Sequence, residues 1–167
     1  MAIAASLLKK LVQIPIFQGL TVPEAAEFFE VSTESVAAKG AQLFAEGDAG
    51  DSLLVILEGD VLITKRGIEL ATLGQHSVLG EMSLVGSGDT RSATATTQSQ
   101  TRYLTVPTKR VQKLLKGNSL AALKVFANLA QVLSRRLALI NDKFVDSKGK
   151  KREELADFGK ILNRWAF

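Results

Sequence analysis

Between about residues 31 and 106, short apolar runs rich in β-branched residues alternate with glycine turns. The runs are LLVIL at 53–57, VLIT at 61–64, ELATL at 69–73, SATATT at 92–97 and TRYLTV at 101–106. Turn signals that recur every eight to twelve residues or so are typical of an all-β sandwich or barrel, not of alternating strands and helices. The sequence therefore predicts a β-barrel in this part of the chain.

Residues from about 5 to 30 follow a helical pattern. Leu7, Leu8, Leu11 and Ile14 lie near helical spacing before Pro15 breaks the pattern. A second short helix is expected near residue 21, because TVPE at 21–24 has the spacing of a capping box with a proline in the first turn.

After Pro107 the pattern is helical again. A short helix is expected to about Lys116, followed by a long helix that begins near Ser119 with Asn118 as its N-cap. The long helix carries a heptad-like stripe of Phe126, Ala130, Leu133, Leu137, Ile140 and Phe144, and beside it a stripe of Val125, Leu129, Val132 and Leu139. Two stripes suit burial against the barrel and against a twin helix of a second subunit; alternatively, one broad face packs on its own barrel.

These patterns divide the chain into four segments. We expect an N-terminal helical segment at 1–30, the β-barrel at 31–106, lid or dimerisation helices at 107–144, and a basic linker with a short amphipathic helix at 145–167. The predicted fold class is mainly β with flanking helices, a jelly-roll or double-stranded β-helix barrel with N-terminal helices and a long C-terminal helix.

The composition argues against several classes of function. The chain has no cysteine and one histidine, His76, so thiolate sites and a cupin-type metal enzyme lack their ligands. We expect no metal, no cofactor and no enzymatic activity. The apolar runs are all shorter than the roughly 18 residues of a membrane span, and we expect a cytoplasmic protein without a transmembrane segment.

Nucleic acid is not the expected partner, although the net charge is +4. The positive residues are scattered through helices instead of forming one stripe. About 23 residues follow Phe144, fewer than a helix-turn-helix needs, so we expect no sequence-specific DNA binding.

The candidate site lies in GEMSLVGSGDTRSAT, residues 80–94. Backbone N–H groups near Met82 and Ser83, at the start of a helical turn, can donate to an anionic oxygen. Arg91 can form two charge-assisted hydrogen bonds to a phosphate, whereas Glu81 repels phosphate and suits a ribose hydroxyl. By itself, however, a Glu and an Arg ten residues apart also fit an ordinary surface ion pair.

Set among its neighbours, the segment resembles the cyclic nucleotide-binding domain family, which includes bacterial catabolite-activator-type regulators. The resemblance runs from about Leu8 to Phe144 and rests on IPIFQGLT at 14–21, LFAEGDAGDSLLVILEGDVLI at 43–63, and LGEMSL with RSAT, which is similar to the family's phosphate-binding cassette. It implies a regulatory protein that binds cAMP or cGMP and converts occupancy into movement of its C-terminal helices.

The resemblance also implies a role for each cassette residue. Glu81 would accept a hydrogen bond from the ribose 2′-hydroxyl, and Arg91 would bind the equatorial phosphate oxygen. Gly80 would let the backbone approach the sugar closely, and the amides of Ser83 and Ser92 would donate to the phosphate.

Further implied positions lie outside the cassette. Asp51 matches an acid that, in some members, pairs with the phosphate-binding arginine and relays occupancy to the helices; alternatively it is a turn residue. Ile140 and Asn141, near the end of the long helix, match base-facing positions. The base is expected against apolar strand residues that equally suit the barrel core, namely Ile63, Leu70 and Ala71.

Two departures from the family pattern affect no ligand group: Leu79 replaces an aromatic residue and Thr90 a proline. The preference between cAMP and cGMP stays open.

The alternative function is a domain that kept the fold but lost the ligand and serves as a protein-interaction or dimerisation module; intact Glu81 and Arg91 favour the receptor. Expected partners are the nucleotide, a second copy paired through 126–144, and an unidentified effector protein.

Overall fold

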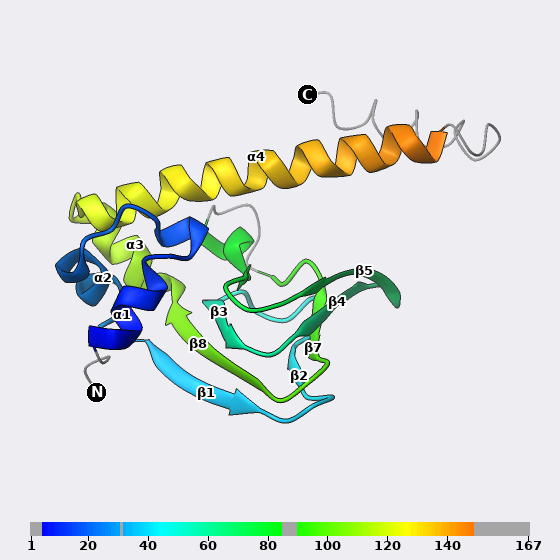
Figure 1. The fold of residues 1–167 in the computed structure, drawn as a ribbon, viewed down its shortest axis with the longest axis horizontal. Helices are drawn as coiled ribbons and strands as arrows, with labels where there is room; N and C mark the ends of the chain where they lie inside the picture. Colours follow the sequence, from blue (N-terminus) through cyan, green and yellow to red (C-terminus); the bar gives the residue numbers. More distant parts are fainter. Residues whose placement is uncertain (1–4, 31, 85–89, 149–167) are drawn as a thin grey trace. The chain divides into compact units, whose positions relative to one another are not determined.

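The structure is a computed structural model that describes residues 5–30, 32–84 and 90–148 (Figure 1). The chain divides into two compact units, Met1–Leu129 and Ala130–Phe167. The barrel and the N-terminal helices belong to the first unit, and the division falls within the long helix.

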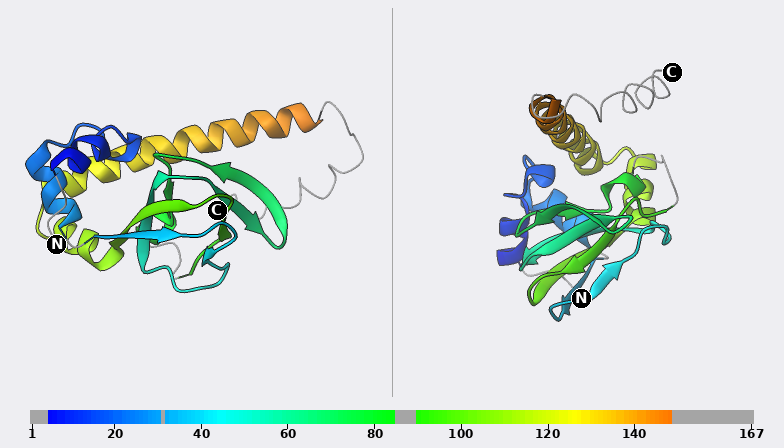
Figure 2. Two further views of the ribbon diagram at one scale, coloured as in Figure 1. Left: turned by 60° about the horizontal axis from the view of Figure 1, so that its bottom comes forward. Right: turned by 90° about the vertical axis from the view of Figure 1, so that its right-hand side faces the viewer.

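In the described part of the first unit, eight strands form two antiparallel four-stranded sheets, which Figure 2 shows from two further directions. The order in the first sheet is β1-β8-β3-β6, and in the second β2-β7-β4-β5. The first comprises β1 (Thr33–Ala37), β8 (Thr101–Pro107), β3 (Ser52–Glu58) and β6 (Val78–Leu79), and the second β2 (Gln42–Phe44), β7 (Thr94–Thr97), β4 (Val61–Lys65) and β5 (Ile68–Leu73). Strands distant in sequence pair in both sheets, as in a jelly roll, and the predicted fold class is confirmed.

Side chains from both sheets form one apolar core. Its buried members are Leu54, Ile56, Val61, Leu79 and Ala95. On β3 the alternate residues Leu53 and Val55 are also fully buried, because helix α3 packs against β3 and β8. Because both faces of β3 are buried, its sequence is a continuous apolar run and does not alternate between apolar and polar residues.

The N-terminal helical segment consists of α1 (Ala5–Leu11), the 3-10 turn η1 (Pro15–Phe17) and α2 (Val22–Phe29). The predicted capping box is confirmed: the backbone N–H of Glu24 donates to Oγ1 of Thr21 over 3.4 Å, and the N–H of Thr21 donates to Oε2 of Glu24 over 2.7 Å. Three fully buried rings, Phe17, Phe28 and Phe29, pack together with centroids 4.8–5.5 Å apart.

Two helices follow the barrel, α3 (Thr108–Lys116) and α4 (Leu120–Lys148). The prediction that Asn118 is the N-cap of the long helix is wrong. Asn118 has a left-handed φ of 55°, and the N–H groups of Asn118 and Ser119 donate to the carbonyls of Leu115 and Leu114, which closes the end of α3. The hydroxyl of Ser119 accepts from the N–H of Ala122 over 3.5 Å, so Ser119 caps α4.

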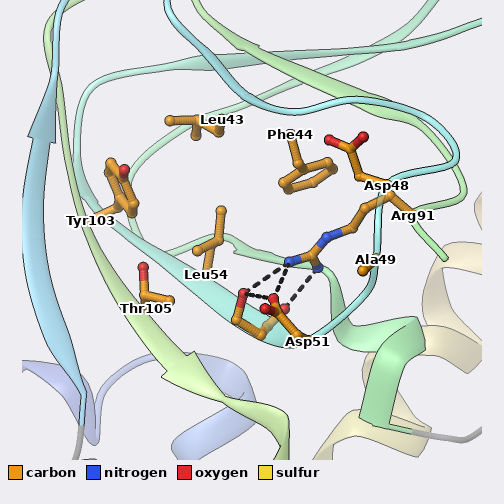
Figure 3. Close-up of a pocket in the computed structure, with 10 residues that line it drawn as sticks. Leu43, Phe44, Asp48, Ala49, Asp51, Leu54, Arg91, Tyr103 and Thr105 are labelled. Atoms are coloured by element: carbon orange, nitrogen blue, oxygen red, sulfur yellow. Dashed lines mark hydrogen bonds and ion pairs between the residues drawn. The ribbon is translucent and has the colours of Figure 1, made fainter. Parts of the chain in front are cut away.

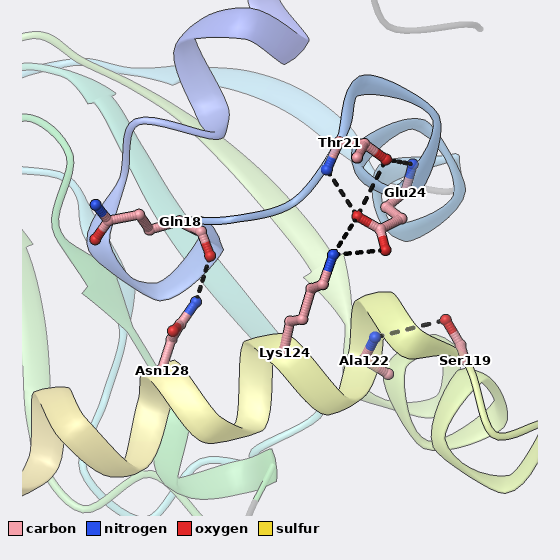
Figure 4. Close-up of polar contacts among 7 residues, drawn as sticks. All are labelled: Gln18, Thr21, Glu24, Ser119, Ala122, Lys124 and Asn128. Carbon is pink, nitrogen blue, oxygen red and sulfur yellow. Dashed lines mark hydrogen bonds and ion pairs between the residues drawn. The ribbon is translucent and has the colours of Figure 1, made fainter.

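The first turns of α4, up to Leu129, pack on the N-terminal helices. Ala121, Ala122, Val125 and Leu129 are buried there. Lys124 Nζ lies 2.8 Å from both carboxylate oxygens of Glu24, and the Asn128 amide donates to the backbone carbonyls of Ile16 and Gln18 (Figure 4). Part of the predicted second stripe, Val125 and Leu129, is therefore buried within the first unit.

In the second unit the structure describes α4 from Ala130 onward. Leu137, Leu139 and Ile140 are each about 60% exposed. Pairing of this segment with a second copy stays a prediction, and the side chain of Phe144 and the predicted helix within 145–167 beyond Lys148 lie outside the described residues. Over the ranges that the structure describes, the helices are too short or too polar to cross a membrane.

Candidate functional site

The cassette begins where β6 ends. Gly80 has a left-handed φ of 73°, which turns the chain into the short 3-10 helix η2 (Glu81–Leu84). Ser83 closes the turn: its hydroxyl donates to the Gly80 carbonyl over 2.6 Å and its N–H to the same oxygen over 3.2 Å. The predicted helical turn is therefore present, and the loop at 85–89 lies outside the described residues.

Arg91 lies inside the barrel wall and is only 6% exposed. Its Nη1 donates to the backbone carbonyl of Ser52 over 2.7 Å, and its Nη2 donates to the Ser52 hydroxyl over 2.9 Å. Nη2 is also 3.8 Å from a carboxylate oxygen of Asp51 (Figure 3). The structure thus brings together Arg91 and Asp51, as the resemblance implies, while the relay role of Asp51 stays a prediction.

Gly80 is in close contact with Arg91. A Cβ added at Gly80 would overlap Nη1 of Arg91 and lie 2.8 Å from the Ser52 carbonyl oxygen. Together with its positive φ, this contact requires glycine at position 80. In this structure the group that approaches the glycine is the guanidinium; the predicted approach of a sugar stays a prediction.

The guanidinium of Arg91 has only part of its hydrogen-bonding capacity used. Within the described part of the chain, its buried Nε–H has no hydrogen-bond partner. The Asp51 carboxylate is a weak counter-charge, since its side chain is 81% exposed. Burial lowers the pKa of Arg91, and the charges of Asp51 and Asp48 raise it. An arginine stays protonated under such shifts, so this is a buried cation whose Nε–H donates to no group in the ranges that the structure describes.

A cavity of about 290 Å³ opens beside Arg91 (Figure 3). Of the residues that the sequence predicted for the site, Arg91 and Asp51 line it. The other lining residues were not predicted: Leu43, Phe44, Asp48, Ala49, Ser52, Leu54, Tyr103 and Thr105. Strand register explains part of this set, because Leu54 pairs with Thr105, and Ile56, on the same face of β3, pairs with Tyr103.

The remaining predicted residues lie as follows. Glu81 and Ser83 are partly buried on η2, Met82 is 40% exposed, and Ser92 is exposed beside Arg91. Asn141 is exposed on α4 in the second unit, so its contact with a base stays a prediction.

The three predicted base-contacting residues lie on β4 and β5. Ile63 packs against the core and pairs with Ala71. The alternative that all three belong to the core is wrong for Ala71, which is exposed, and for Leu70, which is 55% exposed. The reason is that β5 is the edge strand of its sheet. A wall for a base stays a prediction for these positions.

Comparison with known proteins agrees with this fold. The sequence model described as "Cyclic nucleotide-binding domain" matches residues 34–118. This chain therefore belongs to the cyclic nucleotide-binding domain family. A solved cyclic nucleotide-binding domain from Methylobacillus flagellatus is similar to it with a TM-score of 0.75 and 25% identity, over 86% of this chain and 85% of that one.

Two longer proteins match in sequence. The cyclic AMP receptor protein of Thermus thermophilus is 30% identical over 74% of this chain and 57% of its own length. Glutaminase 1 of Bradyrhizobium diazoefficiens is 31% identical over 80% of this chain and 22% of its own length. The chain thus spans less than two thirds of either relative.

Proposed function

We propose that this chain is a sensor that binds cAMP or cGMP, with Arg91 holding the cyclic phosphate and Glu81 the ribose 2′-hydroxyl. The observation that carries the proposal is the buried guanidinium of Arg91, whose Nε–H has no partner among the described residues and which lines a cavity. An unsatisfied buried donor costs roughly 1–3 kcal/mol. A phosphate oxygen would satisfy that donor and supply the missing counter-charge.

The surrounding polar groups support a sugar phosphate over a simple anion. Glu81 follows Gly80 directly at the start of η2, and a carboxylate there would repel a free phosphate but accept from a hydroxyl. The relative from Thermus thermophilus is by name a receptor for cyclic AMP. The N–H of Met82 in η2 would add a donor for the phosphate, whereas the N–H of Ser83 donates to the Gly80 carbonyl.

Calorimetric titration with cAMP, cGMP and the open-ring 5′-AMP tests the proposal. We expect saturable binding of at least one cyclic nucleotide and much weaker binding of 5′-AMP, because the open phosphate has a different shape and one more negative charge. If neither cyclic nucleotide gives heat at protein concentrations in the high micromolar range, the receptor is refuted and an interaction module without ligand replaces it.

We also propose that occupancy changes the position of the helices after the barrel. The backbone carbonyl of Asp51 accepts from the N–H of Thr108, the first residue of α3, over 2.8 Å. The hydroxyls of Thr108 and Ser83 are 3.4 Å apart. A ligand held by Arg91 and η2 would therefore act on groups that contact the start of α3. The ligand shifts the equilibrium between two positions of the helices only if it binds more tightly to one position than to the other.

Hydrogen exchange of the amides in α3 and α4 checks this coupling. Saturation with a bound nucleotide is expected to change the protection of residues 108–129, including amides that contact no ligand. Unchanged protection throughout these helices at saturation would contradict helix movement while leaving nucleotide binding intact.

A further inference from the structure

We propose that Phe44 is a positioning residue for Arg91: its ring holds the plane of the guanidinium in the orientation that presents Arg91 to an anionic ligand. The inference deepens the proposed function and rests on it. The direct observation is that Cζ of Arg91 lies 4.4 Å from the centroid of the Phe44 ring (Figure 3). At this separation a cation is attracted to the face of an aromatic ring.

The backbone places Phe44 and Arg91 next to each other. Phe44 is the last residue of β2, and the loop after it is tied to Arg91 by two backbone hydrogen bonds: the N–H of Gly47 donates to the Arg91 carbonyl over 2.9 Å, and the N–H of Arg91 donates to the Asp48 carbonyl over 2.7 Å. The chain that follows Phe44 is therefore joined to the backbone of Arg91 within four residues.

An irregularity in strand pairing directs the ring toward Arg91. The register of β2 with β7 shifts between Gln42 and Phe44. In a regular strand Leu43 and Phe44 would point to opposite faces, yet both pack against the barrel core and both line the cavity. Bulges commonly redirect a side chain in this way.

The contacts of the guanidinium differ in what they fix. Hydrogen bonds to Ser52 hold the Nη1 and Nη2 end, and Gly80 closes one side at Nη1. The Nε edge has no hydrogen bond among the described residues. Among the described residues, the ring of Phe44 therefore limits tilting of the guanidinium plane about the Ser52 hydrogen bonds. Without it, the free Nε–H has no fixed direction.

The test compares Phe44→Leu, which fills similar space without a π-face, with Phe44→Tyr, which keeps one. Side-chain NMR of 15N-labelled arginine reports the Nε–H of Arg91 without any nucleotide. We expect the Phe44→Leu substitution to shift the Nε–H resonance strongly, because the ring-current contribution of Phe44 disappears. We also expect the Nε–H of Arg91 to exchange its hydrogen with solvent faster in this variant. Phe44→Tyr is expected to retain the wild-type shift. An Nε–H resonance unchanged in Phe44→Leu overturns the proposal, whether or not nucleotide binds.

Calorimetry supplies the second readout. Phe44→Leu is expected to weaken binding of the cyclic nucleotide that wild type prefers by roughly threefold to thirtyfold, the range for loss of a cation–π contact, and Phe44→Tyr to restore it. An equal loss in both variants, or a loss of the same factor when Arg91 is alanine, indicates general packing and contradicts positioning. If wild type binds no cyclic nucleotide, the proposed function fails while the NMR result still decides the role of Phe44.

For the case in which Phe44→Leu does not fold, fluorinated phenylalanines at position 44 keep the ring shape and weaken its negative face stepwise. We expect the unfolding midpoint of the free protein to fall stepwise with fluorination, and to stay constant in an Arg91→Met background. Equal trends in both backgrounds would overturn the cation–π contact.

Discussion

Replacing Arg91 with alanine is expected to weaken cyclic-nucleotide binding by roughly thirtyfold or more, since truncating one partner of a buried, hydrogen-bonded charge pair costs about 2–5 kcal/mol. The arginine is 6% exposed and bonded to Ser52, so the protein itself holds this charge at the cavity. Calorimetric titration of wild type and variant with the same nucleotide gives the ratio of dissociation constants.

Two further variants separate the guanidinium from charge alone. Arg91→Lys keeps the positive charge but cannot form two parallel hydrogen bonds, and we expect an intermediate loss. Lys39→Ala removes a positive charge from an exposed position in the turn before β2, and we expect binding within about twofold of wild type, as for a screened surface charge. Wild-type affinity in Arg91→Ala would show that the ligand is held elsewhere.

Replacing Gly80 with alanine is expected to have the second largest effect, on both stability and binding. The left-handed φ of 73° costs a residue with a Cβ about 1–2 kcal/mol. The added Cβ also overlaps Nη1 of Arg91 and crowds the Ser52 carbonyl, so the guanidinium must leave its place. Chemical denaturation measures the first effect and nucleotide titration the second.

The chain offers a matched control at Gly67. Its φ is 77° and a Cβ there would meet no atom within 4 Å. Gly67→Ala is therefore expected to reproduce the backbone cost and leave nucleotide affinity unchanged. In an Arg91→Ala background, part of the extra destabilisation by Gly80→Ala should disappear, because one of the two crowded groups is gone. Identical behaviour of the two glycine variants would rule out the contact between Gly80 and Arg91.

Much of the fold could be predicted because the residues that determine each strand or helix lie close together in the sequence. The strands β3, β4 and β5 coincide within one residue at either end with the apolar runs at 53–57, 61–64 and 69–73, since a buried strand needs a short run of such residues. The capping box at Thr21 and Glu24 is equally local. The N-cap of α4 could not be predicted in this way, because Asn118 and Ser119 both suit an N-cap by residue type. The backbone of Asn118 closes the end of α3, and Ser119 therefore caps α4.

The sequence marks the segment of the candidate site at 80–94 but not the residues that surround Arg91. Gly80, Glu81 and Arg91 follow from a contiguous segment. Phe44 and Ser52 lie 47 and 39 residues before Arg91, and they meet it through strand pairing and a register shift that the sequence does not mark. The exposure of Leu70 likewise depends on β5 being an edge strand, which is a property of sheet order.

A crystal structure of the chain with the nucleotide that it binds more tightly tests directly whether Arg91 holds the phosphate. We expect an oxygen of the cyclic phosphate within hydrogen-bonding distance of Arg91, with the Glu81 carboxylate at the ribose 2′-hydroxyl. A nucleotide bound with its phosphate away from Arg91, while the guanidinium remains on Ser52 alone, would contradict it.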